Sequence, residues 1–233
     1  MTTRNRNKRV LPLSNQDSFI NEVSEEVRRD RLYALYKKYG WIALAFVILV
    51  VAGAAFNEWR KASIAADAQA AGDALLSAFE ISDPSGRAET LATLDGGENP
   101  GRAAILSLAE AGALVESGNI DGAVTILETL AIDPTAPRSY QDLAALKSVI
   151  VAGSSVEPDA RISRLNGLVQ SGGPFALLAL EQIALAEIDA GRTEDAIETL
   201  GEILADAQVS QDLRQRASQL MVSLGAPLTA LAQ

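Results

Sequence analysis

The feature that most limits how this 233-residue chain can fold is an apolar run without a charged residue, WIALAFVILVVAGAAF, at residues 41–56. With its flanks, the segment at residues 39–59 begins at Tyr39 and ends at Trp59. At about 1.5 Å per residue, a helix of this length covers the roughly 30 Å hydrocarbon core of a bilayer, with an aromatic residue at each end. The sequence therefore predicts a transmembrane helix over residues 39–59.

Two other interpretations of this run stay open on sequence alone. A buried helix of a water-soluble domain normally carries a polar face, and this run has none. A cleaved signal peptide is the second alternative, because the small residues AGAA at 52–55 offer a peptidase site. The segment before the run is far longer than the basic region of a signal peptide, so we favour an uncleaved anchor.

Basic residues flank the predicted span unevenly, which sets its expected orientation. Arg28, Arg29, Arg31, Lys37 and Lys38 precede the span, whereas only two basic residues follow it closely. The side richer in Lys and Arg normally stays in the cytoplasm, so we expect the C-terminal domain outside it. In a bacterium this means a single-pass inner-membrane protein with a periplasmic C-terminal domain, and in another cell type it means a lumenal or intermembrane location. The residues predicted to anchor the span are Lys37, Lys38, Tyr39, Trp41, Trp59 and Arg60.

The region before the span is expected to have two parts. Residues 1–16 are polar and basic and are predicted to form a disordered tail. Residues 17–38 place apolar side chains at helical spacing, which predicts a cytoplasmic amphipathic helix that runs into the span. The basic side chains of this helix are expected to contact anionic lipid headgroups, which is typical of a helix on the membrane surface. The alternative is that the helix forms a docking site for a cytoplasmic partner.

Composition excludes several classes of chemistry. The chain contains no Cys and no His, which removes thiol nucleophiles, disulfides and imidazole acids or bases. Residues 39–233 carry eleven Lys or Arg against 25 Asp or Glu, and this negative charge repels nucleic-acid phosphates. The segment GGENPG at 96–101 lacks the Lys and hydroxyl residue of a phosphate loop. We therefore expect no enzyme, no catalytic, cofactor or metal site, and no nucleic-acid partner.

Residues 60–233 are expected to be all-α and internally repeated. The segments ESGNIDGAVTILETLAID at 116–133 and DAGRTEDAIETLGEILAD at 189–206 align at an offset of 73, matching Gly118 with Gly191. Each segment fits a helix that ends at Gly, a short turn and a second helix. Turn signals and small residues predicted at helix crossings recur about every 36 residues, which predicts four helical hairpins. Those small residues are Ala88, Ala123, Ala160 and Ala196.

This period resembles the tetratricopeptide repeat (TPR) in a degenerate form. Ala111 and Ala184 stand at the small position of the first helix, and Leu127 and Leu200 stand at the large apolar position of the second. The large aromatic residues of the repeat are missing, and Arg164 occupies a position where an apolar residue is expected. The expected fold is a TPR-like helical-hairpin solenoid with a C-terminal capping helix.

The order of these parts over essentially the whole chain resembles the single-span tetratricopeptide-like proteins grouped with the ancillary subunit of the Sec translocon and the cell division coordinator repeat domain. The resemblance implies a helical interaction domain in the periplasm, beside the Sec translocon and periplasmic chaperones. We expect a translocon-associated chaperone or adaptor for emerging polypeptides. The alternative is a structural accessory subunit that docks on an envelope or energy-transducing membrane complex without handling client chains.

In the repeat frame, the first helices of the hairpins line a concave groove suited to a peptide or a partner helix. The alternative is that the apolar side chains of this groove pack between neighbouring hairpins as ordinary core and do not bind a partner. The candidate groove residues are Leu108, Gly112, Val115 and Glu116 in one hairpin, and Glu181, Leu185, Ile188 and Asp189 in another.

Overall fold

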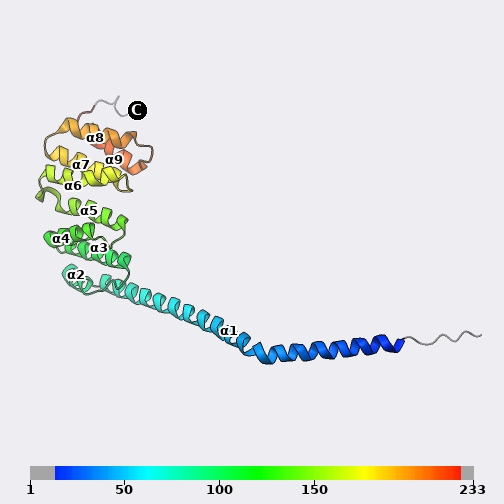
Figure 1. The fold of residues 1–233 in the computed structure, drawn as a ribbon. Helices are drawn as coiled ribbons and strands as arrows, with labels where there is room; N and C mark the ends of the chain where they lie inside the picture. Colours follow the sequence, from blue (N-terminus) through cyan, green and yellow to red (C-terminus); the bar gives the residue numbers. More distant parts are fainter. Residues whose placement is uncertain (1–13, 227–233) are drawn as a thin grey trace, which may run out of the picture. The chain divides into compact units, whose positions relative to one another are not determined.

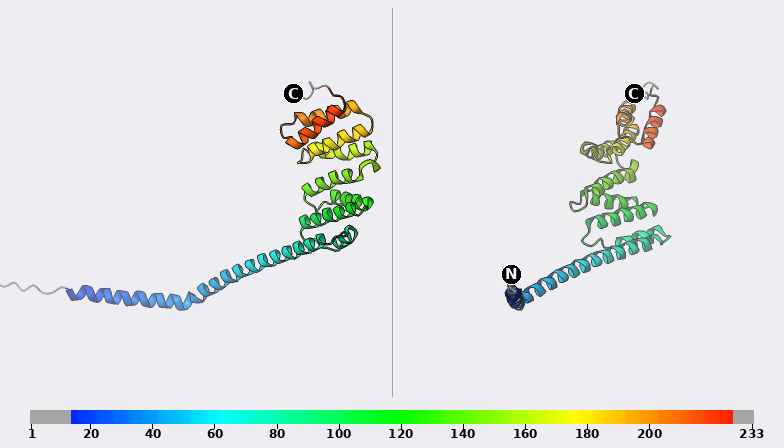
Figure 2. Two further views of the ribbon diagram at one scale, coloured as in Figure 1. Left: turned by 180° about the vertical axis from the view of Figure 1, so that it is seen from behind. Right: turned by 90° about the vertical axis from the view of Figure 1, so that its right-hand side faces the viewer.

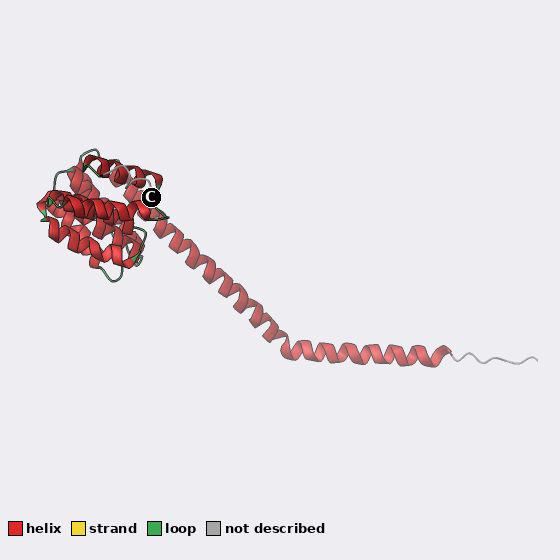
Figure 3. Cartoon of the chain, turned by 90° about the horizontal axis from the view of Figure 1, so that it is seen from above, coloured by secondary structure: helices red, strands yellow, loops and turns green. Residues whose placement is uncertain are grey.

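A computed structural model describes residues 14–226, and these residues are helical, with no strand among them (Figures 1 and 3). The prediction of an all-α chain is therefore confirmed for the part that the structure describes. The chain divides into two compact units, Met1–Ala66 and Asp67–Gln233.

Helix α1 runs from Ser14 to Phe79 and contains both the predicted amphipathic segment and the predicted span. Residues 14–16, expected in the disordered tail, belong to this helix, and residues 1–13 lie outside the described part of the chain. Every described side chain from 41 to 70 is exposed, including Leu49 at 70% and Trp59 at 67%. Within the described residues, Lys37–Phe79 is the one helix segment that is long and apolar enough to cross a membrane.

The second unit consists of successive helices joined by short turns. Each helix from α2 onward packs against the next one in the chain. Figure 2 shows α2 to α8 following one another in chain order, with α9 beside α7 and α8. A short 3₁₀ turn, Gly153–Ser155, separates two of them. The helices are α2 (Pro84–Ala92), α3 (Pro100–Glu116), α4 (Ile120–Ile132), α5 (Arg138–Ala152), α6 (Pro158–Ser171), α7 (Ala176–Asp189), α8 (Thr193–Ala205) and α9 (Gln211–Ser223).

Local sequence signals explain where these helices begin and end. The side chain of Asn119 accepts a hydrogen bond from the Gly122 N–H and caps the start of α4. Gly118 and Gly191 have φ angles of 82° and 74°, a left-handed conformation that glycine adopts without strain. These glycines follow the ends of α3 and α7, as the sequence pattern predicts.

The helix boundaries repeat at the offset seen in the sequence. Helices α4 and α8 have equal lengths, and both their first and their last residues lie 73 positions apart. Ala123 and Ala196 are both fully buried, and so are Leu127 and Leu200. The predicted correspondence between the two segments is thus confirmed in burial as well as in sequence.

The prediction that Ala160 lies where two helices cross is wrong. Ala160 is exposed, although Ala88, Ala123 and Ala196 are buried as expected. Helix α6 begins at Pro158, and its buried positions are Arg161, Leu165 and Leu168, spaced four and three residues apart. Because a helix turns about 100° per residue, that spacing directs Ala160 away from the buried face.

Candidate docking surface around α4

The apolar residues of the expected first-helix groove are half-buried. Leu108 and Val115 pack against the core cluster that contains Ala111 and Ala123, so they contribute to the contact between helices. Leu185 and Ile188 are also half-buried, and Gly112 has no heavy atom within 4 Å of the place where a Cβ would stand. The two predicted sets lie on α3 and α7, which the intervening helices separate in packing order.

All three acidic residues of the expected groove form ion pairs with arginines from other helices. Glu116 pairs with Arg87 of α2, and Asp189 pairs with Arg161 of α6 at 2.7 Å. The two arginines lie 74 residues apart and the two acids lie 73 apart, so this contact is itself repeated. Each pair links one helix to the next in the chain, α2 to α3 and α6 to α7.

Glu181 is the most buried of these acids, with 7% of its surface exposed. Its two carboxylate oxygens accept hydrogen bonds from Arg216 Nε at 2.6 Å and from Arg216 Nη2 at 2.8 Å. The hydrogen bond to Glu181 and the negative charge of its carboxylate raise the pKa of the Arg216 guanidinium, so the guanidinium stays charged. Glu181 therefore holds α9 against α7 and offers little free surface to a partner.

The residues predicted to anchor the span are exposed on α1. Lys37, Lys38, Tyr39, Trp41, Trp59 and Arg60 all belong to this exposed set. The Lys38 ammonium lies 5.5 Å from the centre of the Tyr39 ring at one end of the apolar run. At the other end, the rings of Phe56 and Trp59 have centroids 6.0 Å apart.

Two hollows flank α4 and share Thr129 and Ile132 as a common ridge. The first has a volume of about 500 Å³ and lies between α4, α5 and α6; the second has a volume of about 560 Å³ and lies between α3 and α4. Ile132 is 81% exposed on this ridge. The first hollow is lined by Thr125, Glu128, Thr129, Ala131, Ile132, Ala145, Ser148 and Arg164, and the second by Ala103, Ala104, Ser107, Glu110, Ile126, Thr129, Leu130, Ile132, Asp133 and Pro134.

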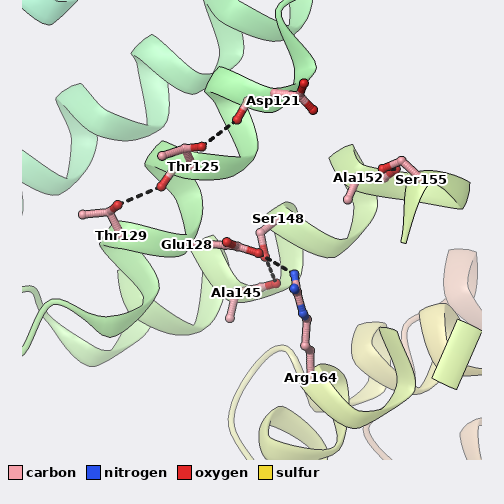
Figure 4. Close-up of polar contacts among 9 residues, drawn as sticks. All are labelled: Asp121, Thr125, Glu128, Thr129, Ala145, Ser148, Ala152, Ser155 and Arg164. Carbon is pink, nitrogen blue, oxygen red and sulfur yellow. Dashed lines mark hydrogen bonds and ion pairs between the residues drawn. The ribbon is translucent and has the colours of Figure 1, made fainter. Parts of the chain in front are cut away.

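Hydroxyl groups around the first hollow are satisfied within their own helices (Figure 4). Thr125 Oγ1 donates to the Asp121 carbonyl at 2.8 Å, and Thr129 Oγ1 donates to the Thr125 carbonyl at 2.8 Å. Ser148 Oγ makes a similar bond to the Ala145 carbonyl at 2.9 Å. Because these donors are already used, the hollow offers mainly methyl and methylene groups to a ligand.

An ion pair lines the first hollow. Figure 4 shows Arg164 reaching from α6 toward Glu128 of α4, and the two side chains form a charged hydrogen bond. Both side chains are nearly half exposed, so the bridge contributes little to stability. The Arg164 that departs from the repeat pattern in sequence thus forms one edge of this hollow.

The walls of the second hollow come from two helices and from the residues that follow the second one. Ala103, Ser107 and Glu110 of α3 form one wall, and the other wall comes from α4 with Asp133 and Pro134 after its end.

The acids of the second hollow differ in their electrostatic surroundings. Partial burial raises the pKa of Glu110, and no Lys or Arg pairs with Glu110 in the described part of the chain. Hydrogen bonds from the Thr135 hydroxyl and N–H lower the pKa of Asp133, which therefore carries its charge at neutral pH.

Comparison with protein-family models, curated proteins and solved structures finds no match to this chain. Over the described residues, no group of three or more His, Cys, Asp or Glu side chains is placed to hold a metal ion. The described part of the chain therefore consists of one exposed apolar helix segment and a unit of packed helices. Two hollows of that unit lie beside α4.

Proposed function

We propose that this protein is a membrane-anchored protein–protein interaction module that acts as a translocon-associated chaperone or adaptor for exported or membrane proteins. The exposed apolar segment of α1 carries the proposal. Nine large apolar side chains between residues 42 and 56 favour a bilayer over water by roughly 3 to 5 kcal/mol, and residues 41–56 contain no charge to oppose insertion. A bilayer around residues 39–59 is the simplest environment for such a surface.

The proposed architecture of the second unit is a TPR-like solenoid of four hairpins with α9 as its cap. Packing in chain order and the repeated boundaries of α4 and α8 support it. The first hairpin joins the end of α1 to α2, where Ala78 and Leu91 share a buried cluster. Solenoids of this kind present extended surfaces to peptides and partner proteins, and the proposal includes no catalytic step or cofactor.

The proposed location is the bacterial inner membrane, with the helical unit in the periplasm. The excess of Lys and Arg before the span supports this orientation. The order of parts along the chain supports the Sec translocon, periplasmic chaperones or emerging polypeptides as partners.

A fusion and a purification together test this proposal. A reporter that is active only outside the cytoplasm, fused after Gln233, should be active, because the basic flank keeps the N-terminus inside. Affinity purification of the full chain in mild detergent should then recover translocon subunits. An inactive reporter, with a second reporter showing a cytoplasmic C-terminus, would overturn the orientation.

A second candidate function is a structural accessory subunit of an envelope or energy-transducing complex. The ion pairs of Glu116, Glu181 and Asp189 favour it, because these acids hold helices together and leave the expected groove with little free charge. Recovery of such a complex without translocon subunits, and no binding of an unfolded polypeptide by the full chain, would support this candidate over the chaperone.

A further inference from the structure

We propose that the surface around α4 binds an extended polypeptide segment that carries a Lys or Arg beside branched aliphatic side chains. This inference rests on the proposed function, because it gives the partner chemistry of the same interaction module. It centres the binding face on α4, with walls from α3, α5 and α6, and uses other residues than the first-helix groove expected from the repeat pattern.

The shape of the surface fits a segment that crosses a ridge. Thr129 and Ile132 separate two hollows of similar volume, about 500 and about 560 Å³. Side chains of an extended peptide alternate in direction, so a segment laid over this ridge can lower one anchor into each hollow. Ile132 is 81% exposed and would lose much of its contact with water beneath the segment.

The chemistry of the walls selects aliphatic anchors. Thr125, Thr129 and Ser148 donate their hydroxyl hydrogens to carbonyls of their own helices. A polar anchor would lose its bonds to water and find few free donors to replace them. An aliphatic anchor pays no such penalty and gains contact with methyl groups.

The charge of the surface selects a basic residue beside those anchors. Glu110 lines the second hollow without a cationic partner among the described residues, although its burial opposes the charged form. A Lys or Arg from a partner would offset that penalty. Asp133, on the same hollow, adds a second negative charge that no described basic side chain neutralises.

The same charge argument disfavours two other occupants. Residues 67–233 carry 24 Asp or Glu against nine Lys or Arg, and six of those nine are already in ion pairs. A second copy of the unit would bring more negative charge to the surface, and an anionic lipid headgroup would do the same. A basic and apolar segment of another polypeptide is the complementary partner.

Selection from a random 12-residue peptide library displayed on phage tests the inference, with the full chain in nanodiscs as the target. We expect selected peptides to be enriched in Lys or Arg next to Val, Ile or Leu. Thr129→Trp places a bulky ring on the shared ridge and should weaken binding of those peptides by about tenfold or more, because the ring obstructs a segment that crosses from one hollow to the other. The matched control is Glu202→Trp, at the exposed equivalent position 73 residues later, and it should leave binding unchanged.

A second variant tests the charge separately from the shape. Glu110→Gln keeps the volume of the side chain and should weaken binding of the basic peptides by about fivefold while flattening its salt dependence. Glu194→Gln changes the net charge equally at an exposed site on α8 and should have no effect. Circular dichroism of each variant establishes that the helical content is retained.

Three results would overturn the inference. One is a selection without enriched sequences, or one enriched in acidic or purely polar peptides. Another is equal binding of the selected peptides to the wild-type chain and to Thr129→Trp. The third is a wild-type dimer that Thr129→Trp dissociates, which would assign the surface to a second copy. If the membrane complex still co-purifies with the chain in any of these cases, the proposed function stands and only this binding face is rejected.

Discussion

The ion pair between Glu181 and Arg216 gives the sharpest test of how the helical unit is held together. Glu181 lies on α7 and Arg216 on α9, 35 residues away in the chain. Replacing Arg216 with Ala removes both hydrogen bonds and leaves the Glu181 carboxylate almost fully buried without a cation. We expect Arg216→Ala to destabilise the unit.

The magnitude follows from the burial of the two partners. Removing one member of a buried ion pair costs about 3–5 kcal/mol, because the other charge is left uncompensated. Here Glu181 has 9% of its side chain exposed but Arg216 has 49%, so water screens one end of the pair. We therefore expect Arg216→Ala to lower the free energy of unfolding by about 2 kcal/mol.

The internal repeat supplies the matched control. At the offset of 73 residues, Leu108 and Leu143 stand where Glu181 and Arg216 stand in the second segment. The first segment therefore carries two leucines at the positions of the ion pair. The double variant Glu181→Leu with Arg216→Leu should stay within about 1 kcal/mol of the wild type, or exceed it in stability.

Urea unfolding of residues 62–233, followed by far-ultraviolet circular dichroism, measures both effects. The single and double variants together form a cycle that isolates the coupling between the two side chains. A change below about 0.5 kcal/mol in Arg216→Ala would show that this arginine does not compensate Glu181. A double variant as unstable as the single one would refute the equivalence with the leucine pair.

Three further outcomes are expected. Residues 62–233 should form a soluble, helical monomer by circular dichroism and sedimentation, because the hairpins bury their cores against one another, and aggregation or a strand spectrum would contradict the solenoid. Gly96→Ala should cost about 2 kcal/mol in urea unfolding, since its Cβ would lie 2.6 Å from the α3 backbone, whereas Gly112→Ala, with open space, should be neutral or stabilising. Glu110→Gln should raise stability at pH 7. Burial raises the pKa of the Glu110 carboxyl in the folded state above 4.5, so the free energy of unfolding of the wild type rises as the pH falls through that folded pKa. The difference in unfolding free energy between Glu110→Gln and the wild type should therefore disappear near pH 4. A constant difference between pH 4 and 7 would refute this assignment.

Much of the fold is predictable from sequence because its signals are local or periodic. The uncharged run at 41–56 predicts a continuous apolar helix segment, and α1 contains it. Gly118 and Gly191 predict where α3 and α7 end, because a left-handed residue closes a helix at little cost in glycine. The offset of 73 residues predicts the correspondence of α4 and α8, since equal patterns bury equal faces.

The candidate site is less predictable, because it depends on how neighbouring helices meet. The acids of the expected groove could be named from the repeat pattern, but their arginine partners lie 28 to 35 residues away in the chain. A surface arginine and a bridging arginine have the same local sequence signal. Their difference arises only when packing brings α2 to α3, α6 to α7 and α9 to α7.

The sequence by itself determined the helical class, the apolar segment of α1 and the correspondence of α4 with α8, because each depends on patterns within one helix or on their recurrence along the chain. The tertiary structure decided which face is hollow. Glu110 of α3 lines one hollow against α4, and Arg164 reaches from α6 to Glu128 of α4 at the other hollow. Such hollows depend on the relative lengths and positions of several helices, which a repeat pattern in one segment does not specify.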